Sequence, residues 1–329
     1  MYSKDELTEY LSKSQLCALP QSASQMIELA KDPSHGPKEY AEPISADLGL
    51  STQVLRFVNS SFFGFRHKIT SLPMALTLAS VRTIRNFVFW NGLFAVLPNP
   101  QCGPFSVKKL FQDALRRAVF ARIVAERFTE YDSDEAFMCA LLQDMAIPIL
   151  AKKWGNEYAD MIQKSNKQQV RLSTLERDLM GWDHAEAGGM LAVNWGLGES
   201  VGDAVSQHAN NFFADNEMSE LSFVGITALS ALLPKVQDRQ WFENIAFVDG
   251  YRKMFGPKLA ELPEILKIAD EDGERLISLV NLGTAPKRFK EHWDNTLKDL
   301  TLTDPENPEA IEEQLDEYFT QLAGVEENN

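Results

Sequence analysis

The chemistry in this sequence centres on two polar residues inside an apolar helix. Residues 136–150 are apolar except for Gln143 and Asp144, a composition that predicts a buried helix. A buried carboxylate is costly unless its neighbours satisfy it, so Asp144 is either a site residue or a structural lock. On the residues alone we favour the structural lock. His184 and His208 follow along the chain; each is interpreted first as a histidine that needs only a hydrogen-bond partner.

Composition limits the kind of protein that this chain forms. It has 329 residues and is 44% hydrophobic, enough for one large domain or two smaller ones. No apolar run approaches the roughly 18 to 20 residues of a membrane span. The polar start is unlike a secretory signal. The three cysteines, Cys17, Cys102 and Cys139, are widely spaced and fit neither a disulfide framework nor a metal site. We therefore expect a cytoplasmic protein.

The charge of the chain restricts its partners. The formal net charge is -15, and residues 301–329 contain no Lys or Arg. We therefore expect no nucleic-acid and no membrane partner, although a small basic patch is compatible with an acidic surface. The expected partner is a protein or a small ligand. If the ligand carries phosphate, the candidate contacts are arginines, which bind phosphate well; these are Arg82, Arg85, Arg116 and Arg117.

The apolar periodicity is helical nearly throughout. Capping boxes mark helix starts at Asp132, Ser173 and Asp183, and Pro148 predicts a bend or end in the apolar helix. The Pro-rich segment 97–104 separates an N-terminal helical part from the part that carries the apolar helix. We predict helices over 5–12, 22–32, 37–46, 51–60, 72–80, 82–96, 106–128, 133–150, 155–164, 174–180, 184–195, 199–212, 219–234, 257–268, 273–281 and 308–323.

Three groups of residues resemble, in order and spacing, the HDOD family of output domains related to HD-type metal phosphohydrolases. They are the stretch 59–64 (Asn-Ser-Ser-Phe-Phe-Gly), the stretch 140–144 that ends in Gln-Asp, and the stretch 181–188 with its Asp-His-Ala-Glu-x-Gly. The resemblance covers about residues 12–212. It implies an all-α fold with an N-terminal helical lobe packed on an HD-like lobe, and a role in bacterial signal transduction.

The resemblance suggests a division of the chain into four parts. We expect an N-terminal lobe over 1–97 and an HD-like lobe over 104–235. A helical C-terminal extension over 236–302 and an acidic linker with a terminal amphipathic helix over 303–329 follow.

A comparison with HD hydrolases bears on catalysis. Those enzymes use a His on an earlier helix, an adjacent His-Asp pair and a later Asp to hold divalent metal. Here the helix 106–128 has no His, and Gln143 replaces the His of the pair. Two histidines match ligand positions of HD-GYP phosphodiesterases, whose further ligands are missing. We therefore expect no metal, no cofactor and no enzyme activity. The remnant of the HD cleft would contain Asp113, Gln143, Asp144, His184 and His208.

Three functions are compatible with these residues. The leading one is a non-catalytic output or regulatory module in signal transduction that binds a protein or a small ligand. The first alternative is a metal-dependent phosphohydrolase or phosphodiesterase, with a site rebuilt from Asp113, Asp144, His184 and His208. The second alternative is a nucleotide-sensing module without catalysis, which would use the four arginines named above.

Overall fold

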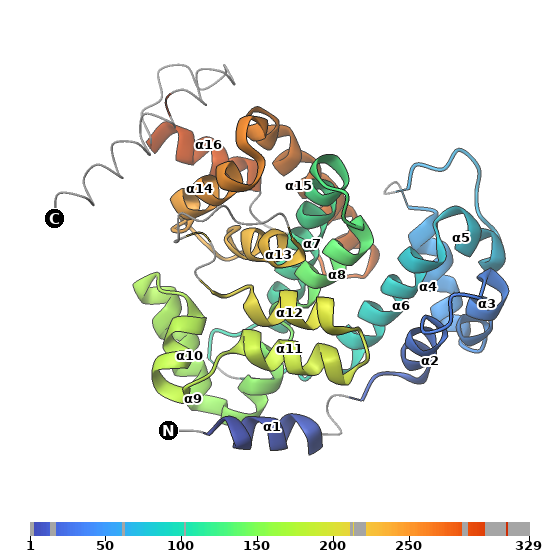
Figure 1. The fold of residues 1–329 in the computed structure, drawn as a ribbon, viewed down its shortest axis with the longest axis horizontal. Helices are drawn as coiled ribbons and strands as arrows, with labels where there is room; N and C mark the ends of the chain where they lie inside the picture. Colours follow the sequence, from blue (N-terminus) through green and yellow to red (C-terminus); the bar gives the residue numbers. More distant parts are fainter. Residues whose placement is uncertain are drawn as a thin grey trace.

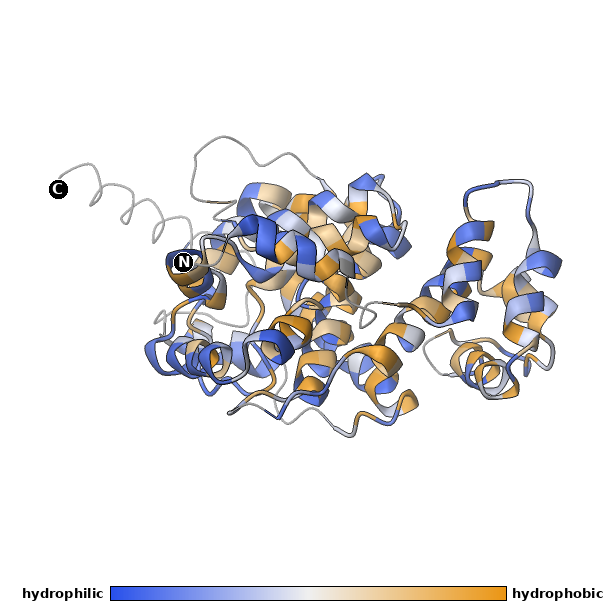
Figure 2. Ribbon diagram, turned by 90° about the horizontal axis from the view of Figure 1, so that it is seen from below, coloured by the Kyte–Doolittle hydropathy of each residue, from blue (hydrophilic) through white to orange (hydrophobic). Residues whose placement is uncertain are grey.

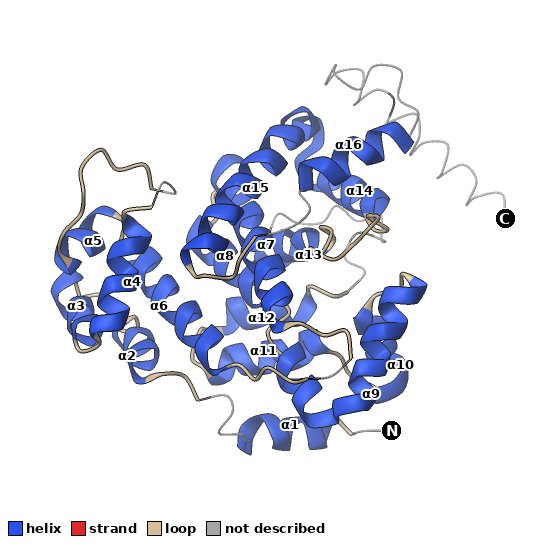
Figure 3. Ribbon diagram, turned by 180° about the vertical axis from the view of Figure 1, so that it is seen from behind, coloured by secondary structure: helices blue, strands red, loops and turns tan. Residues whose placement is uncertain are grey.

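The structure is a computed structural model that describes residues 3–13, 18–60, 63–101, 103–210, 213, 222–284, 289–299 and 314. Within these residues every regular element is a helix, which confirms the predicted all-α fold (Figure 3). No helix in the described part is both long and apolar enough to cross a membrane.

The N-terminal lobe is a cluster of five helices set to one side of the molecule (Figure 1). They are α2 (Gln21–Leu29), α3 (Pro37–Ser45), α4 (Leu48–Val58), α5 (Leu72–Leu78) and α6 (Val81–Val96). α1 (Lys4–Lys13) lies apart from them and packs on α11 of the second lobe. Leu7 and Leu11 of α1 are buried in that contact, so this first helix belongs to the surface of the second lobe.

The second lobe surrounds α7, whose side chains are buried on nearly every face. Around it pack α8, α13 and α15, while α11 and α12 pack on each other. The helices of this lobe are α7 (Val107–Phe128), α8 (Ser133–Leu142), α9 (Ile147–Gln168), α10 (Leu172–Met180), α11 (His184–Asn194), α12 (Glu199–Gln207) and α13 (Phe223–Ala231). Apolar faces turn inward and polar faces outward, as Figure 2 shows.

The last helices are part of the same core. They are α14 (Asn244–Phe255), the 3₁₀ helix η2 (Gly256–Glu261), α15 (Leu262–Leu279) and α16 (Phe289–Asp299). Arg116 on α7 forms a buried ion pair of 2.9 Å with Asp270 on α15. Asp270 also accepts hydrogen bonds from the backbone N–H groups of Phe289 and Lys290. The Asp270 carboxylate thus contacts α7 and the start of α16 from its place on α15. The predicted division of the chain into four parts stays a prediction.

The two lobes meet where α6 passes the start of α8. The side chain of Asp134 accepts a hydrogen bond of 2.6 Å from the hydroxyl of Thr83. Its backbone carbonyl accepts one of 3.1 Å from Asn86, and Arg122 lies 3.7 Å from its carboxylate. This one acidic residue therefore joins α6, α7 and α8.

Several predicted helix boundaries differ from the structure. The predicted helix 133–150 is wrong, because α8 ends at Leu142 and α9 begins at Ile147, with Pro148 in its first turn. The predicted helix 155–164 is part of α9, and the predicted pair 257–268 and 273–281 is largely the single helix α15. Sequence reasoning missed α14 and α16. The predicted helix 308–323 lies outside the described residues, apart from one position.

Two of the three predicted helix caps are present. Asp132 and Asp183 accept hydrogen bonds from the backbone N–H groups of Glu135 and Glu186, as predicted. Ser173 is not a cap, because α10 already begins at Leu172.

Candidate functional site

The break between α8 and α9 places Asp144 at the centre of the second lobe. Residues 143–146 form tight turns in which backbone N–H groups bond to carbonyls three residues earlier. A break is natural here, because Pro148 has no N–H with which to bond the carbonyl of Asp144. The carboxylate of Asp144, 11% exposed, projects from this break toward the ends of two other helices.

Two histidines meet Asp144 from the ends of α11 and α12. His184 is the first residue of α11, directly after its cap Asp183, and His208 caps the C-terminus of α12. Their Nε2 atoms lie 3.3 Å and 3.6 Å from Oδ1 of Asp144. All three residues are buried, and one ligand atom from each lies within 4.8 Å of the others. The structure thus brings together three of the five residues predicted for the remnant HD cleft.

The opposite nitrogen of each imidazole is anchored by an acceptor. Nδ1–H of His184 donates to Oε2 of Glu176 over 2.6 Å, and Nδ1–H of His208 donates to the carbonyl of Val205 over 2.7 Å. The carbonyl accepts only, so the proton of neutral His208 is on Nδ1. The Nε2 lone pair of this histidine therefore faces the Asp144 carboxylate.

Glu176 is a further site residue that sequence reasoning assigned to helix capping. It is fully buried and accepts hydrogen bonds from the backbone N–H of His184 and the hydroxyl of Tyr158, besides the imidazole. A signal for this role exists in the sequence. Leu172, Glu176 and Met180 are spaced four apart and share a helix face, so the acid lies on the apolar side of α10.

The second carboxylate oxygen of Asp144 forms an ion pair with Arg117. Its guanidinium lies 2.8 Å from Oδ2 and also donates to the carbonyl of Leu233. Arg117 is 3% exposed, so this is a buried ion pair. Asp144 therefore presents Oδ1 to the two histidines while Oδ2 is fixed by a permanent cation.

Electrostatics determine the protonation of the cluster when only protein groups are present. Burial alone would raise the pKa of Asp144, but the Nε2–H of His184 and the charges of Arg117 and His184 bring it well below its usual range. Burial alone would lower the pKa of His184, yet Glu176 and Asp144 outweigh it and raise this pKa to about 10. Burial lowers the pKa of His208. At neutral pH His184 is therefore an imidazolium whose Nδ1–H donates to Glu176 and whose Nε2–H faces Asp144.

A narrow cleft connects Asp144 with the surface. It has a volume of about 60 Å³, and Lys109, Asp113 and Lys235 line it together with Asp144. It continues into a wider groove of about 610 Å³ through shared residues, among them Lys235. Asp113 is buried, and its Oδ1 accepts a hydrogen bond of 2.6 Å from the N–H of Val236. Burial raises the pKa of Asp113 to about 6, against the opposing charge of Arg117.

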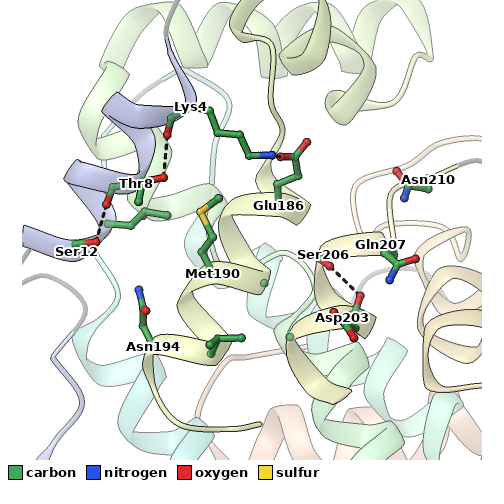
Figure 4. Close-up of a pocket in the computed structure, with 14 residues that line it drawn as sticks. Lys4, Thr8, Ser12, Glu186, Met190, Asn194, Asp203, Ser206, Gln207 and Asn210 are labelled. Carbon is green, nitrogen blue, oxygen red and sulfur yellow. Dashed lines mark hydrogen bonds and ion pairs between the residues drawn. The ribbon is translucent and has the colours of Figure 1, made fainter. Parts of the chain in front are cut away.

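A second hollow lies on the outer side of the same lobe. It is a groove of about 620 Å³ between α1, α11 and α12 (Figure 4). Lys4 of α1 pairs with Glu186 of α11 across it, and Met190 lies between them and Asn194. None of its lining residues belongs to the Asp144 cluster, so we do not place the chemistry in this groove.

The other predicted site residues do not join the cluster. Gln143 is fully buried, and its amide donates to the carbonyl of Ala140 and to Ser230 of α13. The four arginines form no common site in the structure. Arg82 pairs with Asp132, Arg85 bonds to Asn86, Arg116 pairs with Asp270 and Arg117 pairs with Asp144. Their role as anion contacts stays a prediction.

The cluster fits a divalent metal ion by its donors and their separations. Two imidazole nitrogens and a carboxylate oxygen are common ligands of zinc, manganese and iron. Zinc–ligand bonds of about 2.0–2.1 Å put neighbouring tetrahedral ligands about 3.3 Å apart. The observed separations of 3.3 Å and 3.6 Å are similar. Histidines that bind metal through one ring nitrogen usually donate the N–H of the other to a nearby acceptor. Nδ1–H of both histidines does so here.

Comparison with known proteins places this chain in a family. The HDOD domain family matches residues 16–211, more than half of the chain. This chain belongs to the HDOD family. An uncharacterized protein of Treponema pallidum (strain Nichols) is 24% identical over 217 residues, which are 64% of this HDOD chain and 42% of that relative. The chain thus spans less than half of the length of this relative.

Solved structures share the fold of this HDOD protein at low identity. A protein from Shewanella amazonensis, provisionally named a phosphohydrolase, has a TM-score of 0.63 and 19% identity, over 82% of this chain and 97% of its own. A provisional signal transduction protein from Marinobacter aquaeolei has a TM-score of 0.63 and 18% identity, over 85% of this chain and 65% of its own. An HDOD domain protein of unknown function from Geobacter sulfurreducens has a TM-score of 0.59 and 19% identity, over 82% of this chain and 99% of its own.

The expectation that the metal ligands are lost is wrong. The chain lacks the His of the HD pair, yet Asp144, His184 and His208 converge from three parts of the sequence into one possible metal site. Among the structures with this fold are also proteins provisionally named phosphohydrolases. The expectation that this HDOD protein is not an enzyme rested on the loss of ligands and is withdrawn with it.

Proposed function

We propose that this HDOD protein is a signal-transduction protein that binds one divalent transition-metal ion through Asp144, His184 and His208. One observation carries the proposal. Two imidazoles anchored at Nδ1 direct their Nε2 atoms at the same carboxylate oxygen. Such an arrangement of acceptor atoms needs a proton or a metal ion among them. The fold shared with a provisional signal transduction protein supports the signalling role.

The identity of the donors favours certain metals. Imidazole with carboxylate suits zinc, manganese and iron better than calcium or magnesium, which prefer oxygen ligands. The ion would replace the proton on His184, because imidazole coordinates as the neutral base. Metal binding is therefore expected to strengthen as the pH rises and to release a proton.

Metal content tests the proposal directly. We expect purified full-length protein to carry or take up about one equivalent of zinc, manganese or iron by elemental analysis. We expect a higher melting temperature with metal than with chelator. His208→Ala should lose both effects, whereas His67→Ala, which changes an exposed histidine in the N-terminal lobe, should keep them. A protein without metal whose melting temperature ignores all three ions would contradict the proposal.

Phosphoester hydrolysis is a second candidate function, favoured by the cleft beside the cluster. Lys109 and Lys235 line the cleft that reaches Asp144, and lysines are suited to hold a phosphate. A bound ion would supply a water of lowered pKa and polarise a phosphoryl oxygen. Arg117 would keep the Asp144 carboxylate in place, and Asp113, with its pKa of about 6, would hold or release a proton at the cleft wall.

Kinetics with model phosphate esters test this candidate. We expect slow hydrolysis of p-nitrophenyl phosphate or its bis-ester in the presence of manganese or zinc. Lys235→Gln should raise KM with kcat nearly unchanged, because the lysine binds the substrate rather than the reacting atoms. Lys164→Gln, an exposed lysine on α9, serves as control. Metal uptake without any hydrolysis would leave the metal-binding proposal standing and contradict this candidate alone.

A further inference from the structure

Charge is distributed very unevenly along this acidic chain. Between Asp47 and Asp113 lie 65 residues without a single Asp or Glu, although they include seven Lys and Arg. The opposite holds for residues 301–329, which contain nine Asp and Glu and no Lys or Arg. The acid-free stretch builds α4, α5 and α6 of the N-terminal lobe, so these helices and their loops carry cations without carboxylates in a protein of net charge -15.

The loop between α4 and α5 displays the exposed part of this charge. Arg66, His67 and Lys68 are consecutive, exposed and without an ion-pair partner among the residues that the structure describes. Arg56 is likewise exposed at the end of α4. By contrast, Arg82 pairs with Asp132. Arg66 and Lys68 therefore place two exposed cations, unpaired within the described part of the chain, in the α4–α5 loop.

This loop is held in a defined shape at its base. Asn59 accepts a hydrogen bond of 2.8 Å from the N–H of Ile69 and donates one of 2.7 Å to its carbonyl. A second bond runs from the Asn59 amide to the carbonyl of Leu55. This clamp brings Lys68 next to the end of α4, where Arg56 lies one helical turn before Asn59.

Aromatic rings brace the loop from the core outward. Phe87 and Phe57 stack in the buried core, Phe63 meets Phe57 edge-on, and Phe65 stacks on Phe63 with centroids 5.6 Å apart. Phe65 is 37% exposed at the end of this column. A braced aromatic beside cations is typical of an interface anchor, because little side-chain entropy remains to be lost on binding.

The same lobe also exposes apolar side chains. Half of the large hydrophobic residues that are exposed in the described part lie in this short stretch: Leu48, Phe65, Met74 and Leu78. Met74 and Leu78 are four apart and share one face of α5, while Leu48 and Arg56 share one face of α4. We call Leu48, Arg56, the loop residues 65–68, Met74 and Leu78 the basic–apolar face.

We propose that this basic–apolar face binds the acidic segment 301–329 of a second copy of the chain. The sequence of that segment has the complementary chemistry. Ile311, Leu315, Phe319 and Leu322 recur at helical spacing, with carboxylates between them, so the segment offers apolar and anionic groups together. A second copy is inferred because α16, which ends just before the segment, and the α4–α5 loop lie toward opposite ends of the molecule (Figure 1).

Other anionic partners fit the face less well. Nucleic acid offers phosphates but few apolar groups for Met74 and Leu78. A bilayer offers both, but its extended negative surface would also face the acidic remainder of the chain. A short segment contacts the basic–apolar face alone, and beyond roughly 8–10 Å physiological salt screens the other charges.

Sedimentation velocity of the full chain tests the proposal. The loop variant carries Arg66→Gln and Lys68→Gln, and the segment variant carries Glu312→Gln, Glu313→Gln, Asp316→Asn and Glu317→Gln. We expect wild-type protein to associate as its concentration rises and to dissociate between about 0.15 M and about 1 M salt. Each variant alone should associate at least about tenfold more weakly. An equimolar mixture of the two variants should regain association, because one supplies the segment and the other the face.

Control variants separate this contact from nonspecific charge effects. Lys164→Gln with Lys167→Gln removes two exposed lysines from α9 and should behave like wild type. Circular dichroism checks that each variant is folded. Wild-type protein that stays monomeric at every concentration would overturn the proposal, as would a mixture that does not associate. Self-association that is unchanged by the segment substitutions would also overturn the proposal. So would binding to phosphatidylserine vesicles or duplex DNA that depends on the loop and occurs without self-association, because the face would then bind another partner.

Discussion

At the scale of single residues, Asp144 shows how a charge is kept inside this fold. Its two oxygens have different partners, Arg117 on one side and two histidines on the other. Removing one member of a buried pair leaves the other charge without compensation, which costs more than the pair itself contributes. This division of its oxygens lets Asp144 be held by Arg117 while Oδ1 faces the two histidines.

We therefore expect Asp144→Ala to lower the free energy of unfolding by about 3–5 kcal/mol in chelator-treated protein. Arg117→Met added to this change should cost much less than the sum of the single changes, because it removes the stranded cation. Urea denaturation of the two single variants and the double variant measures this coupling. Strict additivity would show that Arg117 and Asp144 act independently.

Asp113 predicts a pH effect of the opposite sign from that of an ordinary salt-bridged acid. Its pKa is about 6 in the folded protein against an ordinary value of 3.8, so the folded state binds the proton more tightly. Its contribution to stability is therefore greatest at low pH and falls as pH rises between about 4 and 6. Asp113→Asn should be the more stable protein at pH 8, by up to about 3 kcal/mol. Urea midpoints at pH 5 and pH 8 measure this, with exposed Asp160→Asn as control; equal gains at both would refute it.

The sequence predicted part of the site and missed its supports. Asp144 was conspicuous because it interrupts an apolar run, and the two histidines were found by resemblance to a family. The convergence of these residues could not be read locally, because α7, α11 and α12 supply Arg117, His184 and His208 from distant positions. Gln143, in place of the His of the HD pair, led to the wrong expectation that the metal ligands are lost. A possible metal site depends on which side chains lie close together in the fold, not on one sequence motif.

At the scale of elements, helix starts were predicted better than helix interruptions. Caps act through side chains within three residues, so Asp132 and Asp183 could be recognised directly. The fusion of two predicted helices into α15 depends instead on a distant residue. Gly273 lies against Arg116 of α7, and a Cβ there would be 2.9 Å from Cγ of the arginine. The sequence prediction began a new helix at Gly273, whereas the glycine lies inside α15 in close packing with Arg116.

Gly273→Ala should therefore destabilise the protein by about 1–3 kcal/mol. Helix propensity alone predicts a gain of about 1 kcal/mol for this change. The clash should win because Arg116 cannot move away: Asp270 holds its guanidinium, which lies 3.8 Å from the ring centre of Phe289. Ser278→Ala, an exposed change on the same helix, is the control for propensity. A higher urea midpoint for Gly273→Ala would show that the arginine adapts.

At the scale of the whole molecule, the two lobes are held together by few polar contacts. The fold class was predictable because helical periodicity runs through the chain, but the docking of lobes was not, because it depends on pairs such as Thr83 and Asp134 far apart in sequence. The site lies entirely in the second lobe, and the basic–apolar face lies entirely in the N-terminal lobe. The junction of α6 with α7 and α8 is one route by which one could influence the other.

Asp134→Ala should loosen this junction without disturbing the cluster of Asp144, His184 and His208. The change removes the acceptor of the Thr83 hydroxyl and the carboxylate beside Arg122, while the backbone bond from Asn86 remains available. Local stability differs between cooperative units, so the N-terminal lobe should open more often than the second lobe. Hydrogen exchange followed by mass spectrometry should show faster exchange in α2 to α6 and unchanged exchange in α11 and α12. Arg82→Gln, at an exposed ion pair of the same junction, should have a much smaller effect. Equal acceleration across both lobes would mean instead that the protein unfolds as one unit and that no independent motion of the N-terminal lobe exists.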